Sequence, residues 1–133
     1  MMDLKVHGHQ QLMLELAEIA SHIDPKVVDG LDEVADKIVE DAKELCPVDT
    51  GALRRSIRKD KQLVSLYPFT YTIGVTAGGQ VKNPRTGREV DYAAYVEFGT
   101  SRTPAQPFMG PAMEKNQGEV RRILSKKVLE VLR

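Results

Sequence analysis

The sequence predicts an α+β fold, in which a long amphipathic helix and a C-terminal helix pack on a small, mainly antiparallel sheet. Two long segments, residues 25–45 and 108–132, carry apolar side chains at every third or fourth position, as amphipathic helices do. Between them, residues 62–66 and 71–75 are short runs rich in β-forming residues. At 133 residues the chain is expected to form a single domain around one core.

The first helix of the chain is expected over residues 10–20. Leu12, Leu16 and Ile19 recur there at helical spacing, so residues 1–23 are predicted to form an N-terminal helical extension. Asp24-Pro25 then indicates a cap followed by proline in the first turn of the long helix. That helix ends before Pro47, because proline cannot continue it.

A third, short helix is expected over residues 52–57, capped by Asp49 or Thr50. The same Asp49-Thr50-Gly51 segment matches the core of the aspartic protease signature, whose chemistry needs two aspartates that share a proton. In those enzymes the aspartate follows a buried strand, whereas here it follows a helix and precedes Arg54. Helix capping is therefore the favoured interpretation, and the protease is kept as an alternative.

Residues 77–90 are rich in glycine and turn-forming pairs and are expected to form a long loop or a protruding hairpin. The segment has little to bury and contains three cations, Lys82, Arg85 and Arg88, which make it an expected interface. Our hypothesis is that it is mobile in the free protein and orders when it docks on a neighbouring ring of subunits. An inert flexible loop is the alternative.

Residues 91–113 hold most of the aromatic side chains. Tyr92 to Glu97 is expected to form a short helix that Gly99 ends, and a proline-rich elbow leads to the C-terminal helix. The spacing predicts that four rings enter the core rather than form a ligand cage, namely Tyr92, Tyr95, Phe98 and Phe108. Glu97 and Arg102 flank the elbow and are candidates for an ion pair across a subunit contact. Gly118 is expected to mark a bend or a close approach in the last helix.

The net charge is zero, but the charges are segregated along the chain. Residues 1–50 carry 4 Lys and Arg against 12 Asp and Glu, whereas residues 51–90 carry 8 against 2. Such a chain can dock complementary faces on copies of itself, or it can neutralise its charges within one subunit; both readings stay open. The basic run from Arg54 to Lys61 also keeps a nucleic-acid-binding protein as an alternative function.

Composition excludes several other classes. Hydrophobic content of 41% with 29% charged residues is typical of a soluble globular protein, and no apolar run reaches membrane-spanning length. A single cysteine, Cys46, excludes an internal disulfide and is expected to be buried in packing. His7 and His9 make a poor metal site. No nucleophile, acid–base or metal-ligand grouping is recognised, so we predict no catalytic residue, no cofactor, no metal and no enzymatic activity.

Three separated motifs resemble those of the gp-ten-like head–tail joining proteins of phages and prophages, also called tail-completion, neck or minor tail proteins. They are residues 47–57, 92–100 and 104–112, in the family's order and spacing. The positions that carry the resemblance are Asp49, Thr50, Gly51, Leu53, Arg54, Ser56, Tyr92, Tyr95, Glu97, Phe98, Gly99, Pro104, Pro107, Phe108 and Pro111. With the flanking helices the resemblance covers residues 27–132, and the first two dozen residues match nothing in it.

The resemblance implies a compact α+β fold and a structural role in joining the DNA-filled head to the tail, without catalysis. It implies copies of the chain as partners in a ring, for which a hexamer is one candidate, together with the head connector or adaptor and the tail tube. DNA would pass through such a ring without being specifically bound, and neither a membrane nor a small molecule is implied. The expected location is the head–tail junction of the virion, with the host bacterial cytoplasm before assembly.

Overall fold

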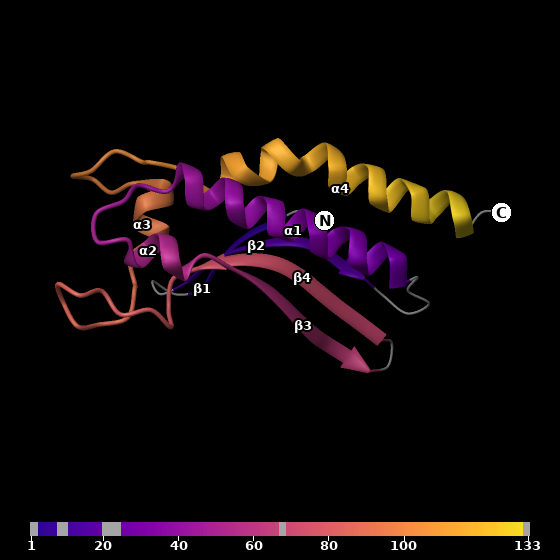
Figure 1. Ribbon diagram of the computed structural model, residues 1–133, viewed down its shortest axis with the longest axis horizontal. Helices are drawn as coiled ribbons and strands as arrows, with labels where there is room; N and C mark the ends of the chain where they lie inside the picture. The colour runs from indigo at the N-terminus through magenta and orange to yellow at the C-terminus, as the bar shows by residue number, and fades with distance from the viewer. Residues whose placement is uncertain (1–2, 8–10, 20–24, 67–68, 132–133) are drawn as a thin grey trace.

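A computed structural model describes residues 3–7, 11–19, 25–66 and 69–131 of the chain. It contains a four-stranded sheet covered on one face by two long helices, with two short helices and two loops gathered at one end (Figure 1). This architecture confirms the predicted α+β class. No helix within the described residues is both long and apolar enough to cross a lipid bilayer.

The sheet consists of β1 (Asp3–His7), β2 (Gln11–Ile19), β3 (Arg58–Leu66) and β4 (Phe69–Ala77) in the order β1-β2-β4-β3. Every neighbouring pair is antiparallel. The β3–β4 pair confirms the two strands predicted around residues 62–75, although each strand is longer than predicted. Because β4 lies between β2 and β3, the N-terminal hairpin completes the sheet from the other side.

The helix predicted over residues 10–20 is wrong, because this segment is strand β2. Leu12, Leu14 and Leu16 also recur at the two-residue spacing of a strand, so the sequence fits both periods. The segment forms a strand because it pairs with β4, where Leu12 lies opposite Ala77 and both residues are fully buried. Residues 1–23 are therefore not a helical extension. Within that range, residues 1–2, 8–10 and 20–23 lie outside the described residues.

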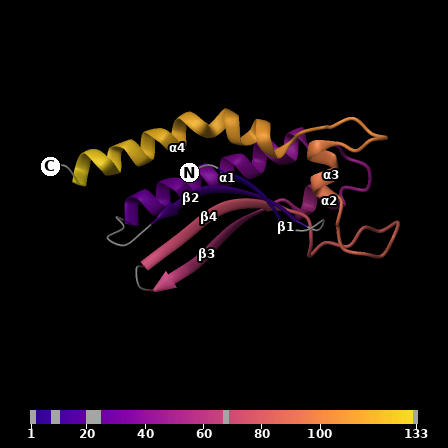
Figure 2. The same ribbon diagram turned by 180° about the vertical axis from the view of Figure 1, so that it is seen from behind.

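Helices α1 (Pro25–Leu45) and α4 (Met109–Val131) confirm the two long helices that the sequence predicts. They lie side by side on the same face of the sheet, with α1 over β4 and β3 and α4 over β2 (Figures 1 and 2). The core between these layers is aliphatic, with one large ring. Its fully buried members of largest volume are Phe108, Leu12, Leu31, Ile38, Ile57, Ile73, Met109, Val34, Val75, Val90 and Val120.

The close approach between the long helices falls at a different glycine from the one predicted. A Cβ atom added to Gly30 of α1 would lie 3.3 Å from Cδ1 of Ile123 on α4. A Cβ added to Gly118 would meet nothing within 4 Å, so the close approach expected there is wrong. Gly30 thus allows α4 to lie against α1 near the start of α1.

Part of the acidic charge of α1 is neutralised within the subunit. The Lys59 ammonium on β3 lies 3.1 Å from Asp32 and 2.9 Å from Asp36. These two carboxylates raise the pKa of Lys59, chiefly through the hydrogen bond that Lys59 donates to Asp36 and then through the one that it donates to Asp32. Asp41 accepts a hydrogen bond of 2.7 Å from the Asn116 amide and pairs with Lys115 at 3.3 Å. These contacts fasten α1 to β3 and to α4.

Candidate functional site

All of the residues predicted to form the family signature or an interface lie at or beside one end of the molecule, which we call the loop end. It comprises residues 46–51, α2 (Ala52–Ser56), an arm of residues 78–91, α3 (Ala93–Phe98) and an elbow of residues 99–108 (Figures 1 and 2). Pro111 lies just beyond it, in the first turn of α4. The site is therefore a surface built by chain segments that are distant in sequence.

Thr50 supports the turn into α2, although the N-cap residue of that helix is Gly51 and neither Asp49 nor Thr50. Thr50 Oγ1 accepts a hydrogen bond of 3.3 Å from the Ala52 amide, one of the free N–H groups at the start of the helix. Gly51 follows Thr50 with a φ of 81°, in the left-handed region that glycine tolerates best. The cap expected from Asp49 is wrong, because this carboxylate is turned toward the arm instead.

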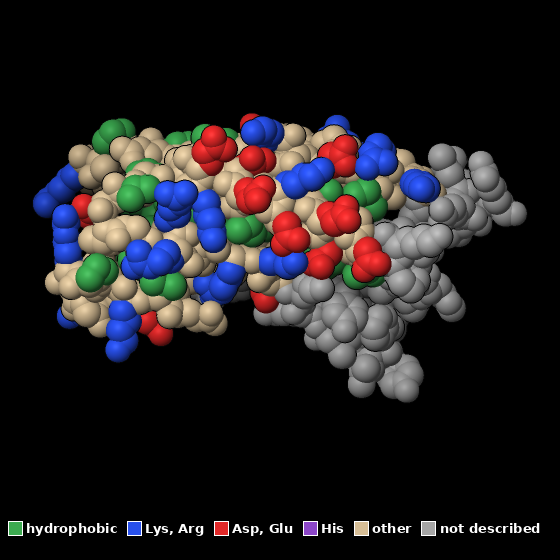
Figure 3. Space-filling view, viewed as in Figure 1, with side chains coloured by type: hydrophobic (Ala, Val, Ile, Leu, Met, Phe, Trp, Pro, Cys, Tyr) green, Lys and Arg blue, Asp and Glu red, His purple; other side chains and the backbone are tan. Residues whose placement is uncertain are grey.

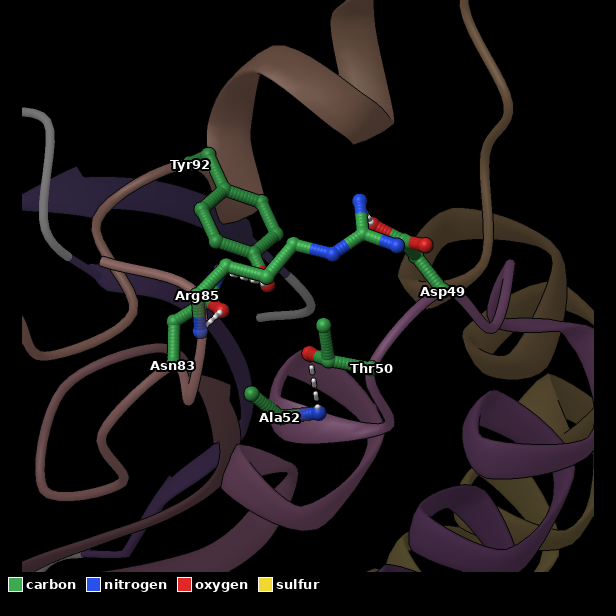
Figure 4. Close-up of polar contacts among 6 residues, drawn as sticks. All are labelled: Asp49, Thr50, Ala52, Asn83, Arg85 and Tyr92. Atoms are coloured by element: carbon green, nitrogen blue, oxygen red, sulfur yellow. Dashed lines mark hydrogen bonds and ion pairs between the residues drawn. The ribbon is translucent and has the colours of Figure 1, made fainter. Parts of the chain in front are cut away.

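Asp49 forms an ion pair that joins the family signature to the arm. Arg85 Nη1 donates to Asp49 Oδ2 over 2.8 Å, and both side chains are about two-thirds exposed (68% and 69%) (Figure 4). An exposed carboxylate paired with an arginine of its own chain differs from the buried, proton-sharing pair that an aspartic protease requires. The geometry therefore favours a structural role for Asp49 over the protease alternative.

The arm is a short hairpin, which was one of the two alternatives predicted for residues 77–90; the other was a long loop. Lys82 and Glu89 form a bridge, and the Val90 amide donates to the Val81 carbonyl at 2.9 Å. At its base, the Gly79 amide donates to the Val90 carbonyl at 2.8 Å. The turn at its tip places Lys82, Arg85 and Arg88 in solvent.

Buried hydrogen bonds anchor the base of the arm to α2. Ser56 Oγ accepts a bond of 2.8 Å from the Gly78 amide and donates to the Leu53 carbonyl. Arg58 Nη1 donates to the carbonyls of Ser56 and Gly78, each at 2.8 Å. The arm therefore projects from a fixed root, and its tip is held by the exposed Asp49–Arg85 pair.

Tyr92 lies where the arm meets the turn of residues 46–51. Its hydroxyl accepts a hydrogen bond of 3.5 Å from the Asn83 amide (Figure 4). Partial burial raises the pKa of the Tyr92 phenol, and the neighbouring Asp49 carboxylate adds to that effect. Cys46, at the end of α1, is buried as predicted, and this burial raises the pKa of its thiol to about 11. The thiol is therefore protonated at neutral pH.

Glu97 has a role that the sequence did not reveal. Its carboxylate is 5% exposed and accepts hydrogen bonds from the amides of Phe108 (2.8 Å), Met109 (3.0 Å) and Gly110 (2.8 Å). These amides are the orphan donors at the start of α4, where a negative charge also complements the helix dipole. The expected pairing of Glu97 with Arg102 across a subunit contact is wrong, because both carboxylate oxygens serve this cap.

The elbow is fixed by turns on either side of its prolines. The Gln106 amide donates to the Val96 carbonyl at 2.8 Å, and Thr100 Oγ1 accepts from the Arg102 and Thr103 amides. Gly99 ends α3 with a φ of 78°, as the sequence predicts, and a Cβ there would lie 2.7 Å from the Ala105 nitrogen. Only glycine fits that corner.

The prediction that four aromatic rings enter the core is wrong for two of them. Phe108 is fully buried and Tyr92 partly buried, but Tyr95 and Phe98 are 45% and 55% exposed. A helix of six residues buries one face, and here that face carries Ala93 and Glu97. The carboxylate that caps α4 thus takes the inward position and turns the two rings outward.

The exposed large hydrophobic residues among the described side chains all lie at the loop end or next to it. We call them the apolar cap: Leu45, Val48, Tyr95 and Phe98, between 45% and 60% exposed. Four exposed cations of the surrounding segments form what we call the basic rim: Arg54, Lys82, Arg88 and Arg102. Figure 3 shows Lys and Arg side chains toward this end and Asp and Glu side chains along the long helices. Exposed aromatic side chains and arginines on one surface are typical of protein interfaces.

Other kinds of site find little support. Within the described part of the chain, no group of three His, Cys, Asp or Glu side chains is placed to hold a metal ion. His9 lies outside the described residues.

Comparison with known proteins assigns the family. Residues 10–99 match the family model "Bacteriophage HK97-gp10, putative tail-component". The match begins at β2, so the prediction that the first two dozen residues match nothing is wrong from residue 10 onward. The match includes the first signature motif and the second up to residue 99, and it ends before residues 104–112. Neither the curated proteins nor the solved structures compared with the chain give a match. The family match over residues 10–99 covers about two-thirds of the chain. The chain therefore belongs to the HK97-gp10-like family of bacteriophage tail components.

Proposed function

We propose that this tail component is a subunit of the ring that completes the tail end and seats it on the head connector. Membership of the family makes it a structural part of the virion. The observation that carries the finer proposal is the loop end, where the apolar cap, the basic rim and the arm project from one end of a rigid helix-on-sheet body.

In this proposal the molecule works by shape and contact rather than by chemistry. The arm and the elbow are the segments that dock on neighbouring rings, while the sheet and the long helices hold them in place. DNA passes through the central hole of the ring without sequence-specific contacts. The protein acts at the head–tail junction of the virion and waits in the bacterial cytoplasm before assembly.

The arm offers a direct test, because its own hydrogen bonds allow it to be shortened cleanly. Val81 and Val90 already pair as the flanking residues of a two-residue hairpin would, so residues 82–89 can be replaced by Asn-Gly. The variant loses the tip and its three cations and keeps the anchored root. We expect it to fold normally and to fail in joining heads to tails.

The experiment complements a phage that lacks this gene and counts joined particles by electron microscopy. Without the protein we expect tails of normal length beside filled, unattached heads, and the arm variant should give the same picture. Arg121→Ala, on the exposed surface of α4, is the matched control and should restore joining. Joined particles made without any protein contradict the proposed function, whereas joining by the arm variant contradicts only the role of the arm.

A further inference from the structure

We infer that the loop end of one subunit docks on an acidic stripe along α1 of a second copy of the same chain. We call this stripe the acidic ridge, and its members are Asp29, Glu33 and Glu40, all exposed. The inference deepens the proposed ring function and rests on it. It assigns the loop end of one subunit and the acidic ridge of the next to the same subunit contact.

The acidic ridge is a coherent surface. At about 3.6 residues per turn, its three carboxylates fall within about 40° of arc around α1 and span about 16 Å of its length. Asp36 lies on the same side of α1, about 20° from Asp29, and pairs with Lys59, whereas Asp32 and Asp41 face β3 and α4. Asp29, Glu33 and Glu40 are exposed and are therefore accessible to a neighbour.

The loop end presents the complementary chemistry. The basic rim and the apolar cap lie at the same end of the molecule, and Arg85, the further cation at the arm tip, is already paired with Asp49. Exposed tyrosine and phenylalanine side chains are favoured as anchors at the centre of protein contacts, while charges at the border guide the encounter. Glu97 holds α3 so that Tyr95 and Phe98 face outward, which makes them available to a partner.

A second copy is the occupant that charge complementarity favours. The basic rim and the acidic ridge lie on different parts of one chain, so their contact is heterologous and can close into a ring. A contact of standard size buries about 800 Å² per partner, a tenth of the 8254 Å² accessible surface of this chain. The loop end of one copy and the α1 flank of the other must each bury about that area in the contact.

Variants that reverse the side-chain charges of the loop end or of the acidic ridge test this inference. The loop-reversed variant carries Arg54→Glu and Arg102→Glu, and the ridge-reversed variant carries Glu33→Lys and Glu40→Lys. Each alone opposes like charges and should lower the self-association constant at least about tenfold at low salt. A mixture of the two restores opposite charges at every contact and should recover the wild-type constant, as should one chain that carries all four changes.

Self-association is measured by sedimentation velocity and by amide shifts of ¹⁵N-labelled protein up to about 1 mM, at about 20 mM and about 500 mM salt. The shifts should fall on α1 around residues 29–40 and on the loop end, and high salt should weaken them. The matched control for the loop-reversed variant, Arg121→Glu with Lys126→Glu on exposed α4, lowers the net charge by the same amount and should leave association unchanged.

The inference would be overturned by no self-association of the wild type, by shifts on other surfaces, or by no recovery in the mixture. Shifts of the loop end that appear only with duplex DNA would overturn it as well, since they assign the rim to phosphates. These outcomes are independent of head–tail joining. A phage that joins normally with the loop-reversed variant would contradict this contact and leave the proposed function standing.

Discussion

Glu97 is the residue on which the geometry of the loop end depends most. A carboxylate with three backbone N–H donors, almost excluded from water, ties the end of α3 to the start of α4 across the elbow. Gly110 belongs to the same arrangement, because a Cβ there would lie 3.0 Å from Glu97 Oε1. One acidic side chain therefore decides both the elbow and the outward position of the neighbouring rings.

Replacing Glu97 by glutamine should destabilise the fold at neutral pH. The amide keeps the volume but loses the negative charge and offers one oxygen where the amides use two. We expect a loss of about 1–3 kcal/mol in the free energy of unfolding, the range for leaving buried donors poorly satisfied. Urea unfolding followed by circular dichroism measures it.

Glu44→Gln is the matched control, because that carboxylate is exposed at the end of α1 and should change stability by no more than about 0.5 kcal/mol. Equal stability of the Glu97→Gln protein and the wild type would show that the carboxylate does not hold the elbow.

At the scale of elements, the sequence alone predicts most of the fold. Both long helices, the short helix at residue 52 and the β3–β4 pair follow from local periodicity, capping residues and prolines. β2 does not, because its leucines satisfy the helical and the strand period together, and its partner β4 is more than fifty residues away in sequence. The outward position of Tyr95 and Phe98 was missed for a related reason: it depends on Glu97 reaching α4, a contact made only by the tertiary fold.

Replacing either of two glycines of α4 by alanine should change the stability of the protein, in opposite directions. Gly118 is exposed with open space around its Cβ position, so Gly118→Ala should stabilise the protein by about 0.5–1 kcal/mol through helix propensity. Gly110→Ala gains the same propensity but pushes against the Glu97 carboxylate, and should be destabilising. Thermal unfolding of both variants shows whether each change raises or lowers stability. A stabilising Gly110→Ala would mean that the Glu97 carboxylate can move aside without loss of stability.

At the scale of the whole molecule, the N-terminal hairpin belongs to the body of the protein. β2 supplies Leu12 to the core and pairs with β4 along nearly its whole length, and it also lies under α4. The single-domain organisation remains a prediction, and the position of β2 in the middle of the sheet favours it.

Truncation tests that organisation. Deleting residues 1–20 removes β1 and β2 and leaves β4 as an open edge beside an uncovered apolar face, so we expect an unfolded or aggregated product. Deleting residues 1–9 removes only the edge strand β1 and is the matched control, which should retain a folded core of lower stability. Circular dichroism and size-exclusion chromatography separate the outcomes. A folded, monomeric product of the longer deletion would show that β1 and β2 are dispensable.

The cap that Glu97 places on α4 also has a mechanical consequence. A molecule that grips Tyr95 or Phe98 pulls on α3, and the carboxylate passes that tension through three N–H···O bonds into the first turn of a 23-residue helix. Because α4 lies along the length of the body against α1, this tension is distributed over the whole subunit and does not act on the loop end alone.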